Sequence, residues 1–244
     1  VEAGVDVEAA NESLRYLSAE DRIRWAVGTY GQSAVLLSSM QKTASVLMHM
    51  FYRMELSNEI LFVDTGFHFR ETLQLRDVFM RCYGLNIVTL YPELTPEQQE
   101  KRCGKKLYLD LEGQKACCRM RKTDPYVAHM TQNARRLTIV GLRRSEGGRR
   151  NGAGFLAADP RIGGHVLHPI YDWSDDQIDA YLDENQVPVH PLHEQAYPSI
   201  GCECCTTPVG PGEDARAGRW RHLRKEGEDG PRYCKIILVD GAGI

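Results

Sequence analysis

Residues 34–63 read AVLLSSMQKTASVLMHMFYRMELSNEILFV, and this stretch decides the fold. Its two ends, residues 34–39 and 59–63, are short and almost continuously apolar, as strands buried on both faces of a sheet are. Residues 43–55 lie between them and show the apolar spacing of one helix face, formed by Val46, Leu47, Met50 and Met54. A strand, a helix and a strand in this order predict two parallel strands joined by a helical crossover.

The alternation continues along the chain. Strands are predicted at residues 86–90 and 137–142, and helices at residues 18–27, 69–83 and 174–185, with one more starting at Thr95-Pro96. This order is typical of an α/β fold with a doubly wound, mostly parallel sheet. The alternation stops near Pro188. We therefore predict an α/β domain over residues 1–187 and a loop-rich C-terminal tail over residues 188–244, packed on the same domain.

Composition narrows the class of protein. The chain has 244 residues, 42% of them hydrophobic and 26% charged, and its net charge of −3 gives no indication of nucleic-acid binding. No apolar run is long enough for a membrane span. Eight cysteines are too few for a disulfide scaffold of this size, so we expect metal-binding or catalytic thiols in a reducing cytoplasm. No signal-peptide pattern is visible, although a chain that begins at Val1 leaves a removed leader open.

Four cysteines point to a metal or cluster site. Cys117 and Cys118 are adjacent, and Cys202 and Cys205 form a C-x-x-C pair. Four thiolates suit either a zinc ion or an iron–sulfur cluster. Adjacent residues on a helix diverge by roughly 100°, which is awkward for two ligands of one small tetrahedral ion. Two sulfurs that reach different irons are easier to accommodate, so the pattern favours a cluster and a redox or sulfur enzyme.

Polar residues follow three of the predicted strands, where ligands bind in parallel sheets, beyond the carboxyl ends of the strands. They are Ser38, Ser39 and Thr43 after the first strand, Asp64, Thr65 and Gly66 after the second, and Arg143 and Arg144 after the fourth. A hydroxyl-rich turn before a helix suits a phosphate or sulfate, although such turns also occur without any ligand. Arginines and lysines are frequent between residues 119 and 150, which indicates a small anionic ligand or a solvated surface.

Several segments resemble the sulfonucleotide reductases. They are LFVDTG (61–66), KACCRMRK (115–122), GLRR (141–144), PLH (191–193), YPSIGCECCT (197–206) and PGEDARAGRW (211–220). Both cysteine pairs sit in contexts that match this family. The resemblance is to the iron–sulfur branch, the adenylyl-sulfate (APS) reductases, rather than to the cluster-free PAPS reductases.

The resemblance implies a PP-loop-type fold, similar to the adenine nucleotide alpha-hydrolases, with the nucleotide bound by the α/β domain. It implies a [4Fe–4S] cluster on Cys117, Cys118, Cys202 and Cys205. It also implies that the enzyme reduces APS to sulfite and AMP, by attack of a tail thiolate on the sulfate sulfur and release of sulfite by thioredoxin or a similar dithiol. An anionic nucleophile and an anionic substrate need positive charge nearby. The candidates are Lys122, one helical turn beyond Cys118, with Arg216 and Arg219.

The chain departs from the family pattern in places. The nucleophile of the family precedes Gly-Leu-His, whereas Cys234 lies in RYCKI and heads an apolar run, so it is either the nucleophile or a structural residue beside a terminal strand. Lys235 beside it would help to lower the pKa of a thiol. Gln41 stands where the family usually has a small residue, Lys42 is also unexpected, and Ser145 and Glu146 replace the usual continuation after Arg144. These positions leave APS, PAPS or another nucleotide open as substrate.

Alternatives remain at this stage. A divergent relative could keep the cluster and nucleotide pocket but perform sulfur transfer or nucleotide activation, and a zinc-stapled binding module belongs to another class altogether. Cys204 is either a bystander or an alternative ligand, whereas Cys82 and Cys103 are predicted to be buried apolar residues. The sequence leaves a homo-oligomer open.

Overall fold

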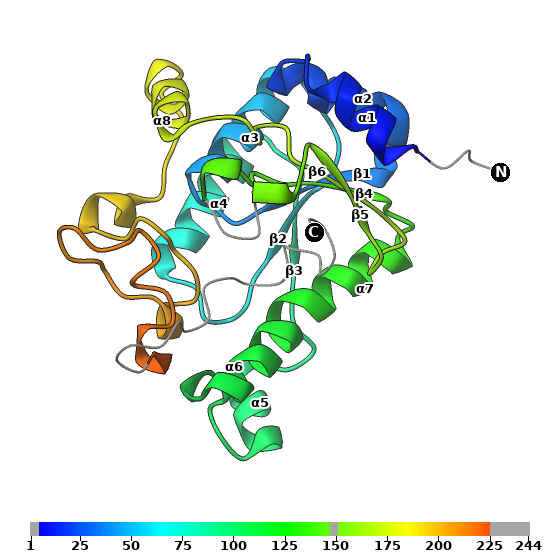
Figure 1. The fold of residues 1–244 in the computed structure, drawn as a ribbon. Helices are drawn as coiled ribbons and strands as arrows, with labels where there is room; N and C mark the ends of the chain where they lie inside the picture. Colours follow the sequence, from blue (N-terminus) through cyan, green and yellow to red (C-terminus); the bar gives the residue numbers. More distant parts are fainter. Residues whose placement is uncertain (1–4, 147–150, 225–244) are drawn as a thin grey trace.

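The structure, a computed structural model, describes residues 5–146 and 151–224 and centres on one six-stranded sheet (Figure 1). Its order is β3-β2-β1-β4-β6-β5, and every neighbouring pair is parallel except β5 and β6. The strands are β1 (Ala34–Ser38), β2 (Ile60–Val63), β3 (Ile87–Leu90), β4 (Leu137–Ile139), β5 (Leu156–Asp159) and β6 (Gly164–Leu167). The predicted parallel strands are thus present, with β4 shorter than expected.

Helices surround this sheet. They are α1 (Val7–Leu14), α2 (Ala19–Tyr30), α3 (Lys42–Arg53), α4 (Arg70–Cys82), α5 (Pro96–Cys103), α6 (Leu111–Cys118), α7 (Asp124–Gln132) and α8 (Asp175–Glu184). The Ser18 side chain caps α2, and Thr95 and Ser174 form full capping boxes at α5 and α8. No bounds were predicted for α1, α6 or α7, although a helical turn was expected between Cys118 and Lys122.

The sheet is buried on both faces, which explains its apolar strands. Alternate residues of β1 point to opposite sides, so Leu36 belongs to one core and Val35 and Leu37 to the other. The first core includes residues of α1, α2, α3, α4 and α8, and the second contains Tyr126 and Met130 of α7. Figure 1 shows α2 and α3 above the sheet and α7 below it. The prediction of a doubly wound sheet is therefore confirmed.

The strand order places a switch point between β1 and β4. The chain runs outward from β1 through β2 to β3, and then returns to β4 on the other side of β1. The loops that leave β1 and β4 lie side by side, because a Cβ added at Gly141 would come within 2.7 Å of the Thr43 side chain. Ligands of open α/β sheets bind at such a point.

The sequence analysis missed one hairpin and was wrong about the burial of two cysteines. The antiparallel hairpin of β5 and β6 was missed, because each strand has only four residues and polar Asp159 and His165 interrupt the apolar pattern. Cys82 was expected to be buried and is exposed, and Cys103 is only half-buried. At the end of α4 the Tyr83 ring packs on Phe79 instead, with the ring centres 5.1 Å apart.

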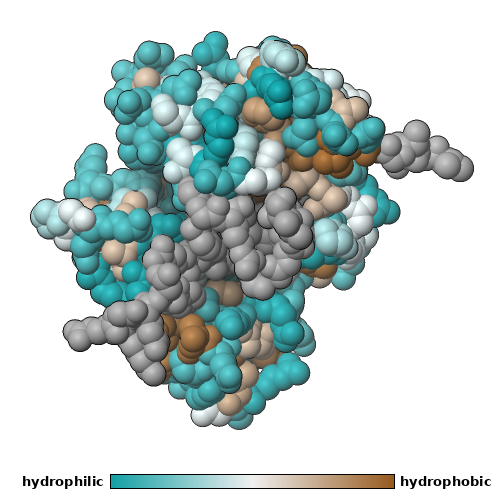
Figure 2. Space-filling view, viewed as in Figure 1, coloured by the Kyte–Doolittle hydropathy of each residue, from teal (hydrophilic) through white to brown (hydrophobic). Residues whose placement is uncertain are grey.

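The part of the tail that the structure describes, residues 188–224, contains 3₁₀ turns but no α-helix or strand of the sheet. This agrees with the loop-rich character predicted from the sequence. No helix in residues 5–146 and 151–224 is long and apolar enough to cross a membrane. The face of the molecule in Figure 2 is mostly hydrophilic, and its brown areas are small and separate.

A buried histidine makes the stability of this fold depend on pH. His168 follows β6, donates its Nδ1–H to the Gly154 carbonyl oxygen at 2.8 Å, and burial lowers its pKa to about 4. The unfolded chain therefore takes up a proton below pH about 6.5 that the folded chain takes up only near pH 4. His168 therefore does not lower the free energy of unfolding above pH about 6.5, but that free energy falls as the pH drops from 6.5 toward 4.

We expect His168→Asn to weaken that pH dependence. The Asn amide can donate the same hydrogen bond to Gly154, but it does not titrate. Between pH 7.5 and 5.5, the wild type should lose about 1 kcal/mol more unfolding free energy than the variant. Urea unfolding at both pH values measures this difference, with His222→Asn on an exposed histidine as control. Equal losses in wild type and His168→Asn would show that His168 does not contribute.

Candidate functional site

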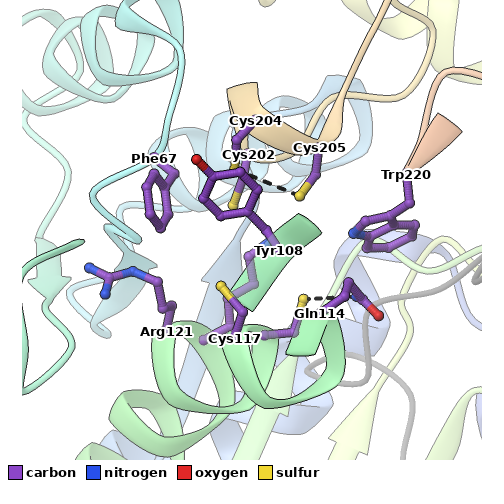
Figure 3. Close-up of a pocket in the computed structure, with 11 residues that line it drawn as sticks. Phe67, Tyr108, Gln114, Cys117, Arg121, Cys202, Cys204, Cys205 and Trp220 are labelled. Atoms are coloured by element: carbon purple, nitrogen blue, oxygen red, sulfur yellow. Dashed lines mark hydrogen bonds between the residues drawn. The ribbon is translucent and has the colours of Figure 1, made fainter. Parts of the chain in front are cut away.

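Both predicted cysteine pairs border one cavity (Figure 3). The space between the lining residues amounts to about 350 Å³ when the part that is open to solvent is included. Its walls come from α6 and the segment after it, the loop after β2, and the tail. The lining residues are Phe67, Tyr108, Gln114, Cys117, Cys118, Arg121, Lys122, Cys202, Cys204, Cys205 and Trp220. Segments far apart in the sequence thus bring five thiols together.

The first pair ends α6. Both sulfurs face the cavity although the residues are adjacent, and each is approached by a different amide. Gln99 Nε2 donates to the Cys117 sulfur at 3.6 Å, and Gln114 Nε2 donates to the Cys118 sulfur at 3.2 Å. Burial raises the pKa of the Cys117 thiol, so a thiolate there calls for positive charge close by.

A π-helical segment, Arg119–Thr123, follows this pair and leads directly into α7. The sequence predicted an ordinary α-helical turn between Cys118 and Lys122, and the wider π turn is the difference. Arg121 and Lys122 both line the cavity. Arg121 lies four residues after Cys117, and Lys122 lies four residues after Cys118. All four side chains therefore share the side of this continuous helical rod, formed by α6, the π-helical segment and α7, that faces the other cysteines.

The second pair lies on a 3₁₀ turn, Glu203–Cys205. Cys202 precedes this turn with an extended backbone, Cys205 ends the turn, and both residues line the cavity. The backbone of Cys202 forms an antiparallel bridge with His68, and the Glu203 amide donates to the Phe67 carbonyl at 2.8 Å. The Thr65 hydroxyl lies 3.4 Å from the Cys202 sulfur. The loop after β2 therefore positions the C-x-x-C pair.

Arg121 connects the two sides of the cavity. It is buried, its Nη1 donates to Gln99 Oε1 at 3.0 Å, and its Nε donates to the Thr65 carbonyl. Its guanidinium also stacks over the Phe67 ring, 5.0 Å from the ring centre. Burial lowers its pKa from the ordinary value. It nevertheless supplies positive charge beside Cys117 and Cys202.

Arg219 organises the peptide just before Cys202. Its Nη1 donates to the Ile200 carbonyl at 3.1 Å and to the Ser199 hydroxyl at 3.3 Å, and its guanidinium lies 4.6 Å from the Trp220 ring centre. Arg216 donates to the same Ser199 hydroxyl at 3.0 Å. The two predicted tail arginines therefore lie together, at the peptide that leads to Cys202.

The residues predicted at the strand ends follow three neighbouring strands of the sheet, β2, β1 and β4. The Met40 amide donates to the Ser38 hydroxyl at 3.2 Å, Ser39 is exposed, and Thr43 lies against Gly141. Asp64 turns back to accept the Gly66 amide at 2.9 Å. The left-handed Gly66, with φ of 71°, lets the chain pass close to Arg121 and Pro96.

The two arginines after β4 differ in their surroundings. Arg143 is buried, and its Nη2 donates to Asp175 at 2.6 Å, in the first turn of α8. Arg144 is exposed. A nucleotide near this loop would therefore meet one arginine already held by an acid and one that faces solvent. Cys234 lies outside the described residues.

Gln41 and Lys42 differ from the family pattern in the loop after β1, and each makes a contact with another part of the structure. Gln41 Oε1 accepts the Ile200 amide at 3.0 Å, and Lys42 pairs with Asp179 of α8 at 2.7 Å. The Ile200 peptide is thus held on its N–H by the loop after β1 and on its carbonyl by Arg219. The roles of Gln99, Gln114 and Gln41 left no signal in the sequence, because a single glutamine in a polar segment is ordinary.

The donor set of the cavity can be compared with what a metal would need. Within residues 5–146 and 151–224, no three His, Cys, Asp or Glu side chains are gathered as ligands of a single metal ion. The thiols instead line opposite walls, with Cys117 facing Cys202 and Cys205 across the cavity (Figure 3). Soft thiols spread around a cavity, with amide donors to two sulfurs, suit a group larger than one ion.

Comparison with known proteins identifies the family. Residues 33–208 match the phosphoadenosine phosphosulfate reductase domain. The chain belongs to this family. It is 36% identical to the adenosine 5'-phosphosulfate reductase of Halalkalibacterium halodurans, over 91% of this chain and 94% of that protein. It is also 36% identical to the reductase of the same name from Mycolicibacterium smegmatis, over 89% and 90% of the two chains.

Solved structures confirm the fold class. The phosphoadenylyl-sulfate reductase of Candida auris, crystallised with phosphate, superposes with a TM-score of 0.73 at 22% identity, over 84% of this chain and all of that one. Yeast FAD synthetase superposes with a TM-score of 0.56 at 15% identity, over 85% and 70% of the chains. At these identities the likeness concerns the PP-loop-type α/β fold.

Gly201 allows Arg219 to approach the segment that precedes Cys202. A Cβ at this position would lie 2.2 Å from Arg219 Nη2 and 2.6 Å from its Cζ. We expect Gly201→Ala to push the guanidinium away from Ser199 and Ile200, and to lower the free energy of unfolding by about 1–3 kcal/mol. Urea unfolding measures this change.

Gly28→Ala is the matched control, because a Cβ there meets nothing within 4 Å. In the interior of α2 it should stabilise the protein by about 0.5–1 kcal/mol. If both alanine variants were equally stable, the close packing of Arg219 on Gly201 would have no energetic importance.

Proposed function

We propose that this protein reduces adenylyl sulfate to sulfite and AMP in assimilatory sulfate reduction, with a dithiol such as thioredoxin as reductant. The observation that carries the proposal is the meeting of both cysteine pairs at one cavity. It occurs in a chain that resembles adenosine 5'-phosphosulfate reductases over about nine-tenths of its length. A PAPS reductase and a divergent relative with other nucleotide chemistry are the alternatives that the experiments below separate.

We propose that Cys117, Cys118, Cys202 and Cys205 hold a [4Fe–4S] cluster. Four thiols around one cavity, the amide donors Gln99 and Gln114, and the buried Arg121 support this assignment. The bound cluster would supply fixed charge and structural support to the site rather than electrons. Iron would also provide the positive partner that a buried Cys117 thiolate requires.

The substrate would bind with its nucleotide at the switch point and its sulfuryl group toward the thiol cavity. The hydroxyls of Ser38, Ser39 and Thr43 lie at the start of α3, where a helix N-terminus favours phosphate. Asp64, Thr65 and Gly66 follow the neighbouring strand β2, and the backbone of this loop continues into the bridge with Cys202. Arg143 and Arg144 complete the other side of the same sheet edge.

The chemical step would be a sulfuryl transfer to the Cys234 thiolate. The thiolate attacks the sulfate sulfur, an S–S bond forms, and the S–O bond to phosphate breaks, so that AMP leaves with the electron pair. The enzyme then carries an S-sulfocysteine. A dithiol attacks the Cys234 sulfur, sulfite leaves with the S–S electron pair, and the second thiol closes a disulfide in the reductant. The two electrons gained by the substrate thus come from the dithiol.

The positive side chains of the cavity would stabilise this step. Both the nucleophile and the sulfuryl group are anionic, and charge shifts toward the oxygens in the transition state. Lys122 lines the cavity, and Arg216 and Arg219 meet at Ser199 beside the C-x-x-C segment. We assign neutralisation of the sulfuryl oxygens to these three side chains.

Labelling with radioactive APS tests the mechanism. The anaerobically purified protein, incubated with [35S]APS without any thiol, should retain covalent label on a denaturing gel and release it as sulfite when dithiol is added. Cys234→Ser should lose the label. Cys82→Ser, which removes an exposed cysteine, should keep it. Iron and sulfide assays on the same preparations show whether the cluster is present, and a zinc-loaded protein would point to the binding-module alternative.

The label also separates the remaining alternatives. Competition by unlabelled PAPS at lower concentration than by APS would make PAPS the substrate. A protein with an intact cluster that takes up no label would be a divergent relative with another reaction.

Lys122→Met tests the charge assignment. We expect the rate of label incorporation to fall by about 10²-fold, because one charged group that faces the transition state is lost. Iron content should stay at the wild-type level. Lys101→Met on the exposed side of α5 is the control. An unchanged labelling rate would remove Lys122 from the mechanism.

A further inference from the structure

The cavity contains one more thiol than a four-cysteine cluster needs. Cys204 lies between the two tail cysteines in the sequence and lines the same cavity. It is half-buried, whereas Cys202 and Cys205 are buried, with 9% and 7% of their surface exposed. Its neighbours around the cavity include Tyr108 and Trp220. The C-E-C-C sequence therefore places a fifth sulfur at the wall from which Cys205 comes.

The position of this sulfur is unusual for the turn that carries it. The Cys205 amide donates to the Cys202 carbonyl at 2.9 Å, so Cys202 and Cys205 stand at the two ends of the 3₁₀ turn. A residue inside the turn points in another direction. The Cys204 sulfur nevertheless lies only 3.7 Å from the Cys205 sulfur, and both face the cavity.

This separation is short enough for both sulfurs to reach the same metal atom. Two sulfurs bonded at about 2.3 Å to one tetrahedral metal atom lie roughly 3.8 Å apart. An iron atom bound by Cys205 would therefore be within reach of Cys204 after a small side-chain movement. None of the other cysteines that line the cavity is positioned to replace Cys205, because they belong to α6 or to the opposite end of the turn.

We propose that Cys204 is an alternative ligand of the iron that Cys205 binds, so that the cluster survives the loss of Cys205. The proposal rests on the cluster assigned above. The exchange replaces one thiolate by another: the Fe–S bond to Cys205 breaks, that to Cys204 forms, and the proton of the Cys204 thiol is taken up at Cys205. No electrons are transferred, and the charge of the cluster with its four ligands is unchanged.

Iron and sulfide content of four variants tests the exchange. Cys205→Ser and Cys204→Ser should each retain close to the wild-type content, because one thiol remains at that wall. The double variant Cys204→Ser/Cys205→Ser should contain at least roughly tenfold less. Cys202→Ser should also lose its iron, because the turn offers no second sulfur at that end.

Alkylation provides a readout that does not depend on activity. In the anaerobic wild-type protein, iodoacetamide should label Cys204 and leave Cys205 protected, as mapped by mass spectrometry. In Cys205→Ser, Cys204 should become protected. Far-ultraviolet circular dichroism of each variant confirms that the chain is folded.

The outcomes are distinct from those that test the reaction. A wild-type protein that contains iron, beside a Cys205→Ser protein as empty as the double variant, would overturn the exchange and leave the cluster assignment intact. Alkylation of Cys204 in an iron-containing Cys205→Ser protein would also overturn it. A wild-type protein without iron would overturn the cluster, and the exchange with it.

Discussion

The backbone bridge between His68 and Cys202 holds the candidate site together. Apart from 3₁₀ turns and a bridge between Thr206 and Arg219, the described part of the tail has no regular structure of its own, so the position of its thiols depends on the bridge to His68. With it, the C-x-x-C segment is attached to the loop after β2, and that loop leaves a strand buried in the centre of the molecule. The sheet thereby fixes the position of a segment that has no α-helix or sheet strand of its own.

The other wall of the cavity belongs to one continuous helical rod, formed by α6, the π-helical segment and α7. Residues of α7 at one end of the rod, Tyr126 and Met130, are fully buried beneath the sheet. Cys117 and Cys118 stand at the other end, beyond the π-helical segment. Because α6, the π-helical segment and α7 follow one another without a break, the packing of α7 determines where the two thiols lie. Arg121 then joins the two walls through Thr65 and Gln99.

The parts of this arrangement that could be predicted are those that depend on periodic patterns or on motifs. Continuous apolar runs predicted the parallel strands, since both faces of the sheet are buried. Motif resemblance identified the four cysteines and the tail arginines. The apolar runs of β5 and β6 are too short to show a strand pattern. The prediction that Cys82 is buried was wrong because this residue lies in the last turn of α4. The supporting glutamines act through single long-range hydrogen bonds, which sequence spacing does not encode.

The contacts of Gln41 and Lys42 give a structural reason for two positions that differ from the family pattern. In the sequence they left the identity of the nucleotide substrate open. In the structure Lys42 forms an ion pair with Asp179 that is about half exposed, with little expected effect on stability. Gln41 instead accepts the Ile200 amide, two residues before Cys202. A side chain that departs from the family pattern therefore connects the loop after β1 to the peptide that carries the C-x-x-C pair.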